Sequence, residues 1–369
     1  MDVQNVAQEK NYKVLVRCNT YNQSQFIESA LNGFAMQITN FPYICIIMDD
    51  ASTDGEPEVL KRYLEEHFDL DDRSIVRNEE TEAFTMTFAR HKTNANCFFA
   101  VYFLKENHFQ KRKTKRPYLV EWRNNSQYVA TCEGDDYWIA PDKLQRQVDF
   151  LESHPDYTMV CNRTKLYSFW RKKFIGENYC YDKSQTVDPK DVIRRTGLFI
   201  STCSMLYRRN ITDNKPDYWS KCSVGDYPLQ IMCAMKGKVY YFNDIMSVYR
   251  VENAHSWMGG QKWLGFSEAR LETIRSQIRM FEGFANDFPE YKKVCQDKIC
   301  DQVNRNIPNR HLSSKEDMKK YLDYFSDIIK HYPLRWKIDL LIRKSRIPGL
   351  RYLYTRYCLE KYSKRCLYY

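Results

Sequence analysis

The stretch Thr131-Cys-Glu-Gly-Asp-Asp-Tyr-Trp138 places three carboxylates within four residues. It overlaps Tyr128-Val-Ala-Thr-Cys132, an apolar run that predicts a short buried strand. Glu133, Asp135 and Asp136 therefore follow a strand end, where open α/β sheets bind their ligands. Carboxylates this close repel one another unless water, a raised pKa or a cation relieves them. Hard oxygen ligands at a strand end favour Mg²⁺ or Mn²⁺ holding a phosphorylated substrate, and the alternative is an acidic turn exposed to water.

Composition predicts an ordinary globular protein. The chain has 369 residues, 43% of them apolar and 28% charged, enough for one large domain or two smaller ones. Residues 1–10 lack the apolar core of a signal peptide, and the densest apolar run, residues 97–104, is too short to span a membrane. The 13 cysteines are scattered, and several lie in apolar runs, which favours buried thiols in a reducing cytosol. We therefore expect a cytoplasmic protein.

Strands and helices alternate through the first half of the chain. Lys13–Cys18 and Tyr43–Met48 are continuous apolar strands, each followed by a helical pattern, from about Ser24 and from Pro57 to His67. Such alternation is typical of a mostly parallel sheet flanked by helices. Further elements are expected as a helix at 141–153, strands at 157–162, 200–207, 239–242 and 247–251, and a helix opened by Gly225 and ending near 236. Residues 95–104 fit helix or strand, and residues 266–331 are expected to be helical. Residues 111–117 are interpreted as a basic loop exposed to water, and contact with phosphates or anionic lipid is the alternative.

The positive charge is concentrated at the C-terminal end. Residues 333–369 hold ten Lys and Arg against two acids, which is about +8 of the chain's net +10. A nucleic-acid-binding protein would spread this charge over a folded face, so we expect no nucleic-acid partner. Aromatic and aliphatic side chains alternate with the cations here, a composition that suits the inner face of an anionic membrane. A C-terminal helix packed on the protein, with its charges in water, is the alternative.

Acidic motifs occur at three places along the chain: within Ile46 to Gly55, within Cys132 to Leu144, and at Asp226. They lie between an opening Val14-Leu-Val with Tyr21-Asn22 and a later Ser247-Val-Tyr-Arg250. Together these motifs and their spacing resemble the family 2 nucleotide-sugar glycosyltransferases of the GT-A fold, most closely a bacterial surface-polysaccharide branch. The resemblance covers about residues 12–257. It implies a Rossmann-like GT-A domain at 1–260, and we expect a helical extension at 261–332 and the basic tail at 333–369 beyond it.

The resemblance also implies roles for individual residues. Asp136 would be the principal ligand of Mg²⁺ or Mn²⁺, with Asp135 and Glu133 in support, and Asp50 would meet the base or ribose of the donor. Asp226 would be the catalytic base of an inverting transfer to a glycan or lipid-linked acceptor. Further donor or metal contacts would come from Thr20, Tyr21, Asn22, Asp49, Ser52, Asp54 and His255. Asp49, Asp54 and Asp226 could instead satisfy backbone groups or cap turns.

Two other function classes fit part of the sequence. A metal-dependent nucleotidyltransferase could use the same carboxylates, but it should carry a glycine-rich phosphate loop where this chain has Asn19-Thr-Tyr-Asn22. A GT-A-like protein that only binds glycan would have no need of all three acidic motifs. The chain departs from the family's pattern at Glu252, where a His is usual, at Asn124-Asn-Ser-Gln127, and at residues 107–123, which resemble an added loop. These departures bear on the donor rather than on the reaction class.

Overall fold

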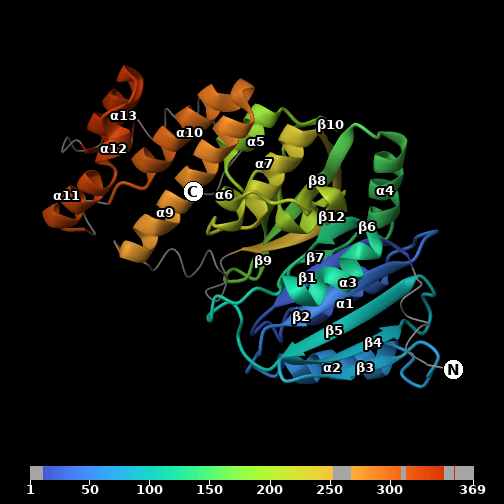
Figure 1. The fold of residues 1–369 in the computed structure, drawn as a ribbon. Coiled ribbons are helices and arrows are strands. Elements are labelled where there is room, and N and C mark those ends of the chain that lie inside the picture. Colours follow the sequence, from blue (N-terminus) through green and yellow to red (C-terminus); the bar gives the residue numbers. More distant parts are fainter. Residues whose placement is uncertain (1–10, 252–266, 309–312, 345–352, 354–369) are drawn as a thin grey trace. The chain divides into compact units, whose positions relative to one another are not determined.

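The computed structural model describes residues 11–251, 267–308, 313–344 and 353 (Figure 1). The chain divides into two compact units. Of the described residues, the first unit holds 11–188, 197–214 and 232–251, and the second holds 189–196, 215–231 and those from 267 onward. This division differs from the expected boundary after residue 260, because residues 189–196 and 215–231 group with the C-terminal helices.

One twelve-stranded sheet organises the first unit. Its main path runs in the order β10-β12-β8-β11-β6-β1-β2-β5-β4-β3, while β7 pairs with β12 and β9 with β8. The strands are β1 (Tyr12–Thr20), β2 (Tyr43–Asp49), β3 (Arg77–Glu80), β4 (Phe84–Arg90), β5 (Cys97–Leu104), β6 (Ser126–Thr131), β7 (Tyr137–Trp138), β8 (Tyr157–Ser168), β9 (Lys173–Asn178), β10 (Gln185–Thr186), β11 (Leu206–Arg208) and β12 (Lys238–Val251).

Four central strands are parallel and set the position of the site. β1 pairs in parallel with β2 and β6, and β2 pairs in parallel with β5. Both faces of β2 are buried throughout, which is why the sequence shows a continuous apolar run there. Since the four strands run in one direction, the loops that follow them emerge at one edge of the sheet.

Helices cover both faces of this parallel core. Val14, Val16 and Cys18 of β1 share one apolar cluster with α1 (Ile27–Ala35), α2 (Glu56–His67) and α4 (Lys143–Ser153). On β5 the alternate side chain Tyr102 faces α3 (Arg116–Asn124), where its hydroxyl accepts a hydrogen bond from the indole of Trp122. The expected α/β architecture, a mostly parallel sheet flanked by helices, is confirmed.

Several expected elements differ in detail. By sequence, residues 95–104 fit helix or strand, and the structure resolves this alternative, because Cys97–Leu104 form strand β5. The expected strands at 239–242 and 247–251 form one irregular strand, β12. In the expected strand 200–207, residues Thr202–Ser204 form a 3-10 helix, and only β11 at its end pairs. The expected loop at 107–123 is also corrected, because α3 begins at Arg116, with Pro117 in its first turn, where the missing N–H of proline costs nothing.

The second unit is helical, as expected for residues 266–331. It contains α5 (Pro189–Arg195), α6 (Asp217–Ser220), α9 (Glu268–Asp287), α10 (Lys292–Arg305), α11 (Lys315–Tyr324), α12 (Ser326–Ile329) and α13 (Leu334–Lys344), while α7 (Asp226–Lys236) begins in it and ends in the first unit. Within the described ranges, no helix combines the length and hydropathy needed to cross a membrane.

Candidate active site

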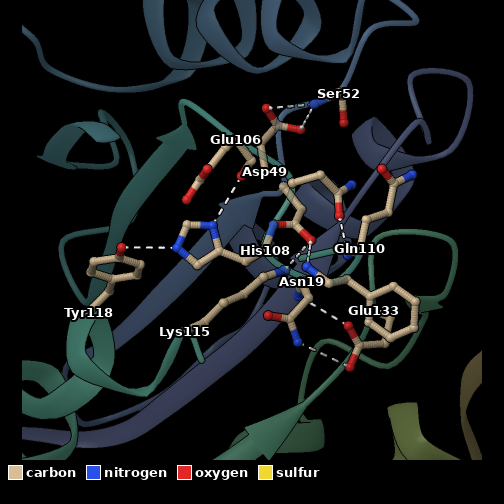
Figure 2. A network of polar contacts seen from close by, with 12 residues as sticks. Asn19, Asp49, Ser52, Glu106, His108, Gln110, Lys115, Tyr118 and Glu133 are labelled. Carbon is tan, nitrogen blue, oxygen red and sulfur yellow. Dashed lines mark hydrogen bonds and ion pairs between the residues drawn. The ribbon is translucent and has the colours of Figure 1, made fainter. Parts of the chain in front are cut away.

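The loops after β1, β2, β5 and β6 bring the predicted site residues of the first unit to one edge of the sheet. Asn19 near the end of β1 contacts Glu133 after β6: its backbone N–H donates to Oε2 at 3.2 Å. Figure 2 shows this contact beside Asp49 and the loop that follows β5. Four separate segments of the sequence therefore meet at the carboxyl ends of parallel strands, the usual binding edge of such sheets.

The acidic turn, Glu133 to Asp136, is pressed closely against the loop after β1. A Cβ added to Gly134 would lie 2.4 Å from the Thr20 hydroxyl oxygen, so this position requires glycine. Its N–H donates to the Asn19 carbonyl at 3.0 Å. Glu133 and Asp135 remain partly exposed, whereas Asp136 is buried. The turn thus presents two carboxylates outward and one inward.

Arg250 at the end of β12 holds the turn from the other side. Its backbone N–H donates to Oδ1 of Asp136 at 2.8 Å, and its guanidinium donates to the Asp135 carbonyl at 2.6 Å. The guanidinium also lies over the rings of Phe26 and Tyr137, at 5.0 and 4.5 Å from their centroids. Asp136 therefore fastens the turn to β12, and its carboxylate is already engaged by the protein.

Burial changes the acid–base properties of the turn. The pKa of Asp135 is raised to about 6 by desolvation first and by the neighbouring Glu133 second. The pKa of Asp136 is also raised, again chiefly by burial, and then by Asp135. A cation among these groups would favour their charged forms.

Asp50 organises the loop that follows β5. Its carboxylate accepts hydrogen bonds from the backbone N–H groups of His108, at 2.8 Å, and Phe109, at 3.1 Å. Lys115 Nζ lies 3.0 Å from its Oδ2. The His108 ring is fixed in turn by Tyr118 and by the Glu106 carbonyl, each at 3.0 Å (Figure 2). Asp50 is thus a buried, paired carboxylate with a cation beside it.

Most of the other residues predicted to contact the nucleotide-sugar connect the loops after β1 and β2 by hydrogen bonds. Asn22 donates its N–H to the Ser52 hydroxyl and accepts from the Thr53 N–H, both at 2.8 Å. Asp54 accepts from the N–H groups of Ser24 and Glu56, which agrees with its reading as a cap. The Thr20 hydroxyl bonds to Glu56, and Tyr21 is 37% exposed at the surface of the same loop.

The sequence did not single out Glu56, His108, Lys115 or Arg250 as site residues. Glu56 is fully buried and joins three groups: the Thr20 hydroxyl, the Gln23 N–H and the Ser52 hydroxyl. Its only sequence signal is an acid in the first turn of a helix, which is common. Lys115 lies in the basic stretch interpreted as a solvated loop, and nothing local distinguishes it from Lys111 or Lys113, which pair with Glu106.

Two predicted site residues do not belong to the described part of the first unit. Asp226 is the first residue of α7 and belongs to the second unit, and its Oδ1 accepts the Tyr227 N–H at 2.8 Å. His255 lies outside the described residues, as does Glu252. Trp138, in contrast, is buried beneath the acidic turn, with its indole N–H donating to the Cys203 carbonyl.

Asp49 gives a pH-dependent prediction. Burial raises the pKa of this carboxyl to about 6, and it accepts the Ser52 N–H. A carboxyl whose folded pKa exceeds its unfolded value stabilises the protein at low pH, and this contribution is lost as pH rises from about 4 to 6. The substitution Asp49→Asn keeps the acceptor oxygen but removes the titrating group. We expect the unfolding free energy of the variant minus that of wild type to be about 1–3 kcal/mol larger at pH 7 than at pH 4.

Denaturant unfolding of both proteins across this range measures the difference. The exposed Asp71→Asn is the control and should give a profile parallel to that of wild type. If the unfolding free energies of Asp49→Asn and wild type changed in parallel with pH, Asp49 would not have the raised pKa that we assign to it.

The outward carboxylates of the acidic turn fit a divalent metal. Asp135 and Glu133 offer hard oxygen donors, and the burial that raises the pKa of Asp135 would be offset by a cation. Among the described residues, no three His, Cys, Asp or Glu side chains are grouped as a metal site. In proteins, Mg²⁺ is commonly held by one or two carboxylates together with substrate phosphates.

Comparison with known sequences supports the reading of the first unit. Residues 19–85 match the model of glycosyl transferase family 2. Proteins of Mycobacterium bovis and Mycobacterium tuberculosis, described as uncharacterized, are 30% identical over 237 residues, which is 64% of this chain and 58% of theirs. The chain therefore matches little more than half the length of these relatives.

Solved structures show the same fold. S. aureus TarS 1–349 in complex with UDP has a TM-score of 0.56 and 16% identity, covering 93% of this chain and 87% of that one. The same protein in complex with UDP-GlcNAc has a TM-score of 0.57 and 15% identity, with 93% and 88% coverage. At this sequence identity, the likeness to the solved structures concerns the fold alone. The segment that matches the family model, residues 19–85, contains the loops after β1 and β2. The chain therefore has the GT-A fold of these solved structures, and its residues 19–85 are similar to the family 2 glycosyltransferases.

Proposed function

We propose that the protein transfers a sugar from a nucleotide-diphosphate sugar to an acceptor hydroxyl. The observation that carries this proposal is the set of loops at the carboxyl ends of β1, β2, β5 and β6, which combines the buried Asp50–Lys115 pair with the outward carboxylates Glu133 and Asp135. One part suits the nucleoside and the other suits the diphosphate. A non-catalytic glycan-binding protein would have no use for this arrangement.

Asp50 and Lys115 are assigned to the nucleoside. The carboxylate already accepts from two backbone N–H groups, so its remaining acceptor capacity and the Lys115 ammonium together offer one acceptor and one donor. A nucleobase edge or a ribose hydroxyl presents the complementary pair. Hydrogen bonds between the loops of Thr20 to Asn22 and Asp49 to Asp54 hold both loops rigid. This rigidity keeps the Asp50–Lys115 pair in position to bind the nucleoside.

Asp135 and Glu133 are assigned to Mg²⁺ or Mn²⁺, with Asp136 in support. The metal would neutralise charge developing on the diphosphate leaving group. We assign Asp135 rather than Asp136 as the principal ligand, because the Asp136 side chain is buried whereas Asp135 is partly exposed. Asp136 and Arg250 instead orient the turn so that Asp135 faces the donor.

Asp226 is assigned as the base that takes the proton from the acceptor hydroxyl. Attack by this hydroxyl on the anomeric carbon opposite the leaving group inverts its configuration. The product's anomeric coupling in proton NMR tests inversion directly. A glycan or lipid-linked acceptor of a surface polysaccharide is the substrate class that the sequence resemblance suggests.

Titration calorimetry with UDP-, GDP- and dTDP-sugars, with Mn²⁺ and then with EDTA, tests the proposal. We expect one class of nucleotide to bind in the presence of metal, with weaker binding after chelation, and mass spectrometry to detect slow release of free sugar. A nucleotidyltransferase would instead bind a nucleoside triphosphate and release pyrophosphate. Failure of every nucleotide-sugar to bind would contradict the proposal.

For attachment to the inner face of the membrane, the candidate surface in the tail is one side of α13. Its other side packs on α10: the Trp336 indole donates to Asp297, and Asn304 donates to Asp339. The rest of the tail lies outside the described residues, apart from Leu353. Because the Trp336 indole is bonded to Asp297 and Leu340 is buried, neither side chain belongs to the candidate surface. The exposed apolar side chains are Leu334, Ile338 and Leu341, at 74, 47 and 64% exposure.

Replacing these three by serine in the full chain should weaken binding to anionic vesicles. Each side chain contributes on the order of 1.5–3 kcal/mol when fully buried in an apolar phase, so partial insertion predicts a loss of at least about tenfold. Flotation measures it, and release at high salt should accompany binding. The exposed Ile38→Ser, in the first unit, is the control. Equal flotation of the triple variant and wild type would leave α13 with no membrane role.

A further inference from the structure

The turn between β8 and β9, residues 169–172, emerges at the same edge of the sheet as the acidic turn. β11 is antiparallel to both β6 and β8, so β6 and β8 run in the same direction. The acidic turn follows the end of β6, and residue 169 follows the end of β8. The chain therefore leaves both strands on the side where the proposed donor site lies (Figure 1).

This turn is aromatic and cationic. Trp170 is 82% exposed, and Phe174 at the start of β9 is 52% exposed. Residues 165–175 contain Lys165, Arg171, Lys172 and Lys173 and no acid. The nearest carboxylate along β9, Glu177, is paired with Arg163. A single exposed apolar residue is common on protein surfaces and needs no explanation. An exposed indole among four cations, in contrast, is typical of segments that bind anionic bilayers.

Ring contacts connect the turn to the proposed site. The Phe169 ring packs edge-on against Phe26, with centroids 5.1 Å apart. The Arg250 guanidinium also lies over the Phe26 ring, 5.0 Å from its centroid, and donates to the Asp135 carbonyl. These contacts fix the position of the turn relative to Asp135, so a surface that binds residues 169–174 would also lie at a fixed position relative to Asp135.

We propose that residues 169–174 form a contact for an anionic phospholipid surface, which holds the opening of the site against the membrane. The proposal rests on the proposed function, because a lipid-linked acceptor is what makes the contact useful. The Trp170 indole and the Phe174 ring enter the headgroup region while Lys172 and Lys173 pair with lipid phosphates. A soluble glycan fits less well, since its hydroxyls need acceptors as well as donors, and no Asp, Glu, Asn or Gln occurs from 165 to 176.

Vesicle flotation of the full chain tests the contact. The variant Trp170→Ser/Lys172→Gln/Lys173→Gln is compared with wild type on vesicles of phosphatidylglycerol and phosphatidylcholine, and on phosphatidylcholine alone. Each cation near such a surface raises the affinity about fivefold, so removing the two lysines alone should weaken binding to the anionic vesicles about 25-fold. The control Ile38→Ser/Lys92→Gln removes an exposed apolar residue and a cation near the opposite edge of the sheet and should bind as wild type does.

A second readout does not depend on the triple variant. Brominated lipid should quench a part of the tryptophan fluorescence of wild type that is missing in Trp170→Phe. Calorimetric affinity for the donor should be unchanged in every variant, which separates failure of this contact from failure of the proposed function. Equal flotation of the triple variant and wild type would overturn the proposal. Unchanged flotation with slower transfer to a water-soluble acceptor would also overturn it and assign the turn to the acceptor.

Discussion

Asp135→Asn is expected to reduce sugar transfer on the order of 10³-fold while leaving the melting temperature close to that of wild type. The carboxylate is partly exposed and its side chain sits in the outward part of the acidic turn, so its removal leaves the fold intact. Loss of charge at the metal costs several kcal/mol of transition-state stabilisation, and about 4 kcal/mol corresponds to a factor of 10³. Initial rates at saturating metal, together with thermal unfolding, measure both effects.

The neighbouring carboxylate provides the control. Asp136 is buried and accepts the Arg250 N–H at 2.8 Å, so Asp136→Ala, which removes this acceptor, should lower the unfolding free energy by about 1–3 kcal/mol. Its activity, measured well below the melting temperature, should fall less than that of Asp135→Asn. Metal affinity should weaken in the Asp135 variant and be nearly unchanged in the Asp136 variant. The opposite ranking, with Asp136→Ala folded and inactive, would restore Asp136 as the principal ligand.

The parallel core could be predicted because its signal is local. Residues 43–48 are apolar at every position since both faces of β2 are buried, and only a strand inside a covered sheet needs such a run. The polar turns directly after these runs then had to meet at one edge. Topology thus brings Asn19 to Glu133, which are 114 residues apart in the sequence.

The burial of each acid could not be read from the sequence. Asp135 and Asp136 are adjacent and chemically identical, and they differ only because β12, which is over a hundred residues away, supplies the Arg250 N–H to one of them. Lys115 is a comparable case: in the sequence it is one cation among several, and Asp50 selects it through a loop whose conformation depends on His108 and Tyr118. Long-range pairing decides such roles, and residue patterns within one segment do not contain it.

Asp226→Asn is expected to lower turnover by roughly 10²–10⁴ while the affinity for the nucleotide-sugar stays near that of wild type. The base meets the acceptor rather than the donor, so its loss affects the chemical step and not donor binding. The substitution keeps an amide oxygen that can still accept the Tyr227 N–H, so the start of α7 should be preserved. Calorimetry of the donor and steady-state rates with a saturating acceptor separate the two quantities.

The matched control is Asp217→Asn, which removes an exposed carboxylate from the first turn of α6 in the same unit. Its turnover should equal that of wild type, because its partner is the surface Lys221 and an exposed pair of this kind contributes little. If donor affinity collapses in Asp226→Asn, the residue binds the nucleotide-sugar or supports the fold instead of acting as the base. If turnover is unchanged, another carboxylate must take the acceptor's proton. Only a fall in turnover at constant donor affinity agrees with general base catalysis by Asp226, since no structural role separates these two measurements.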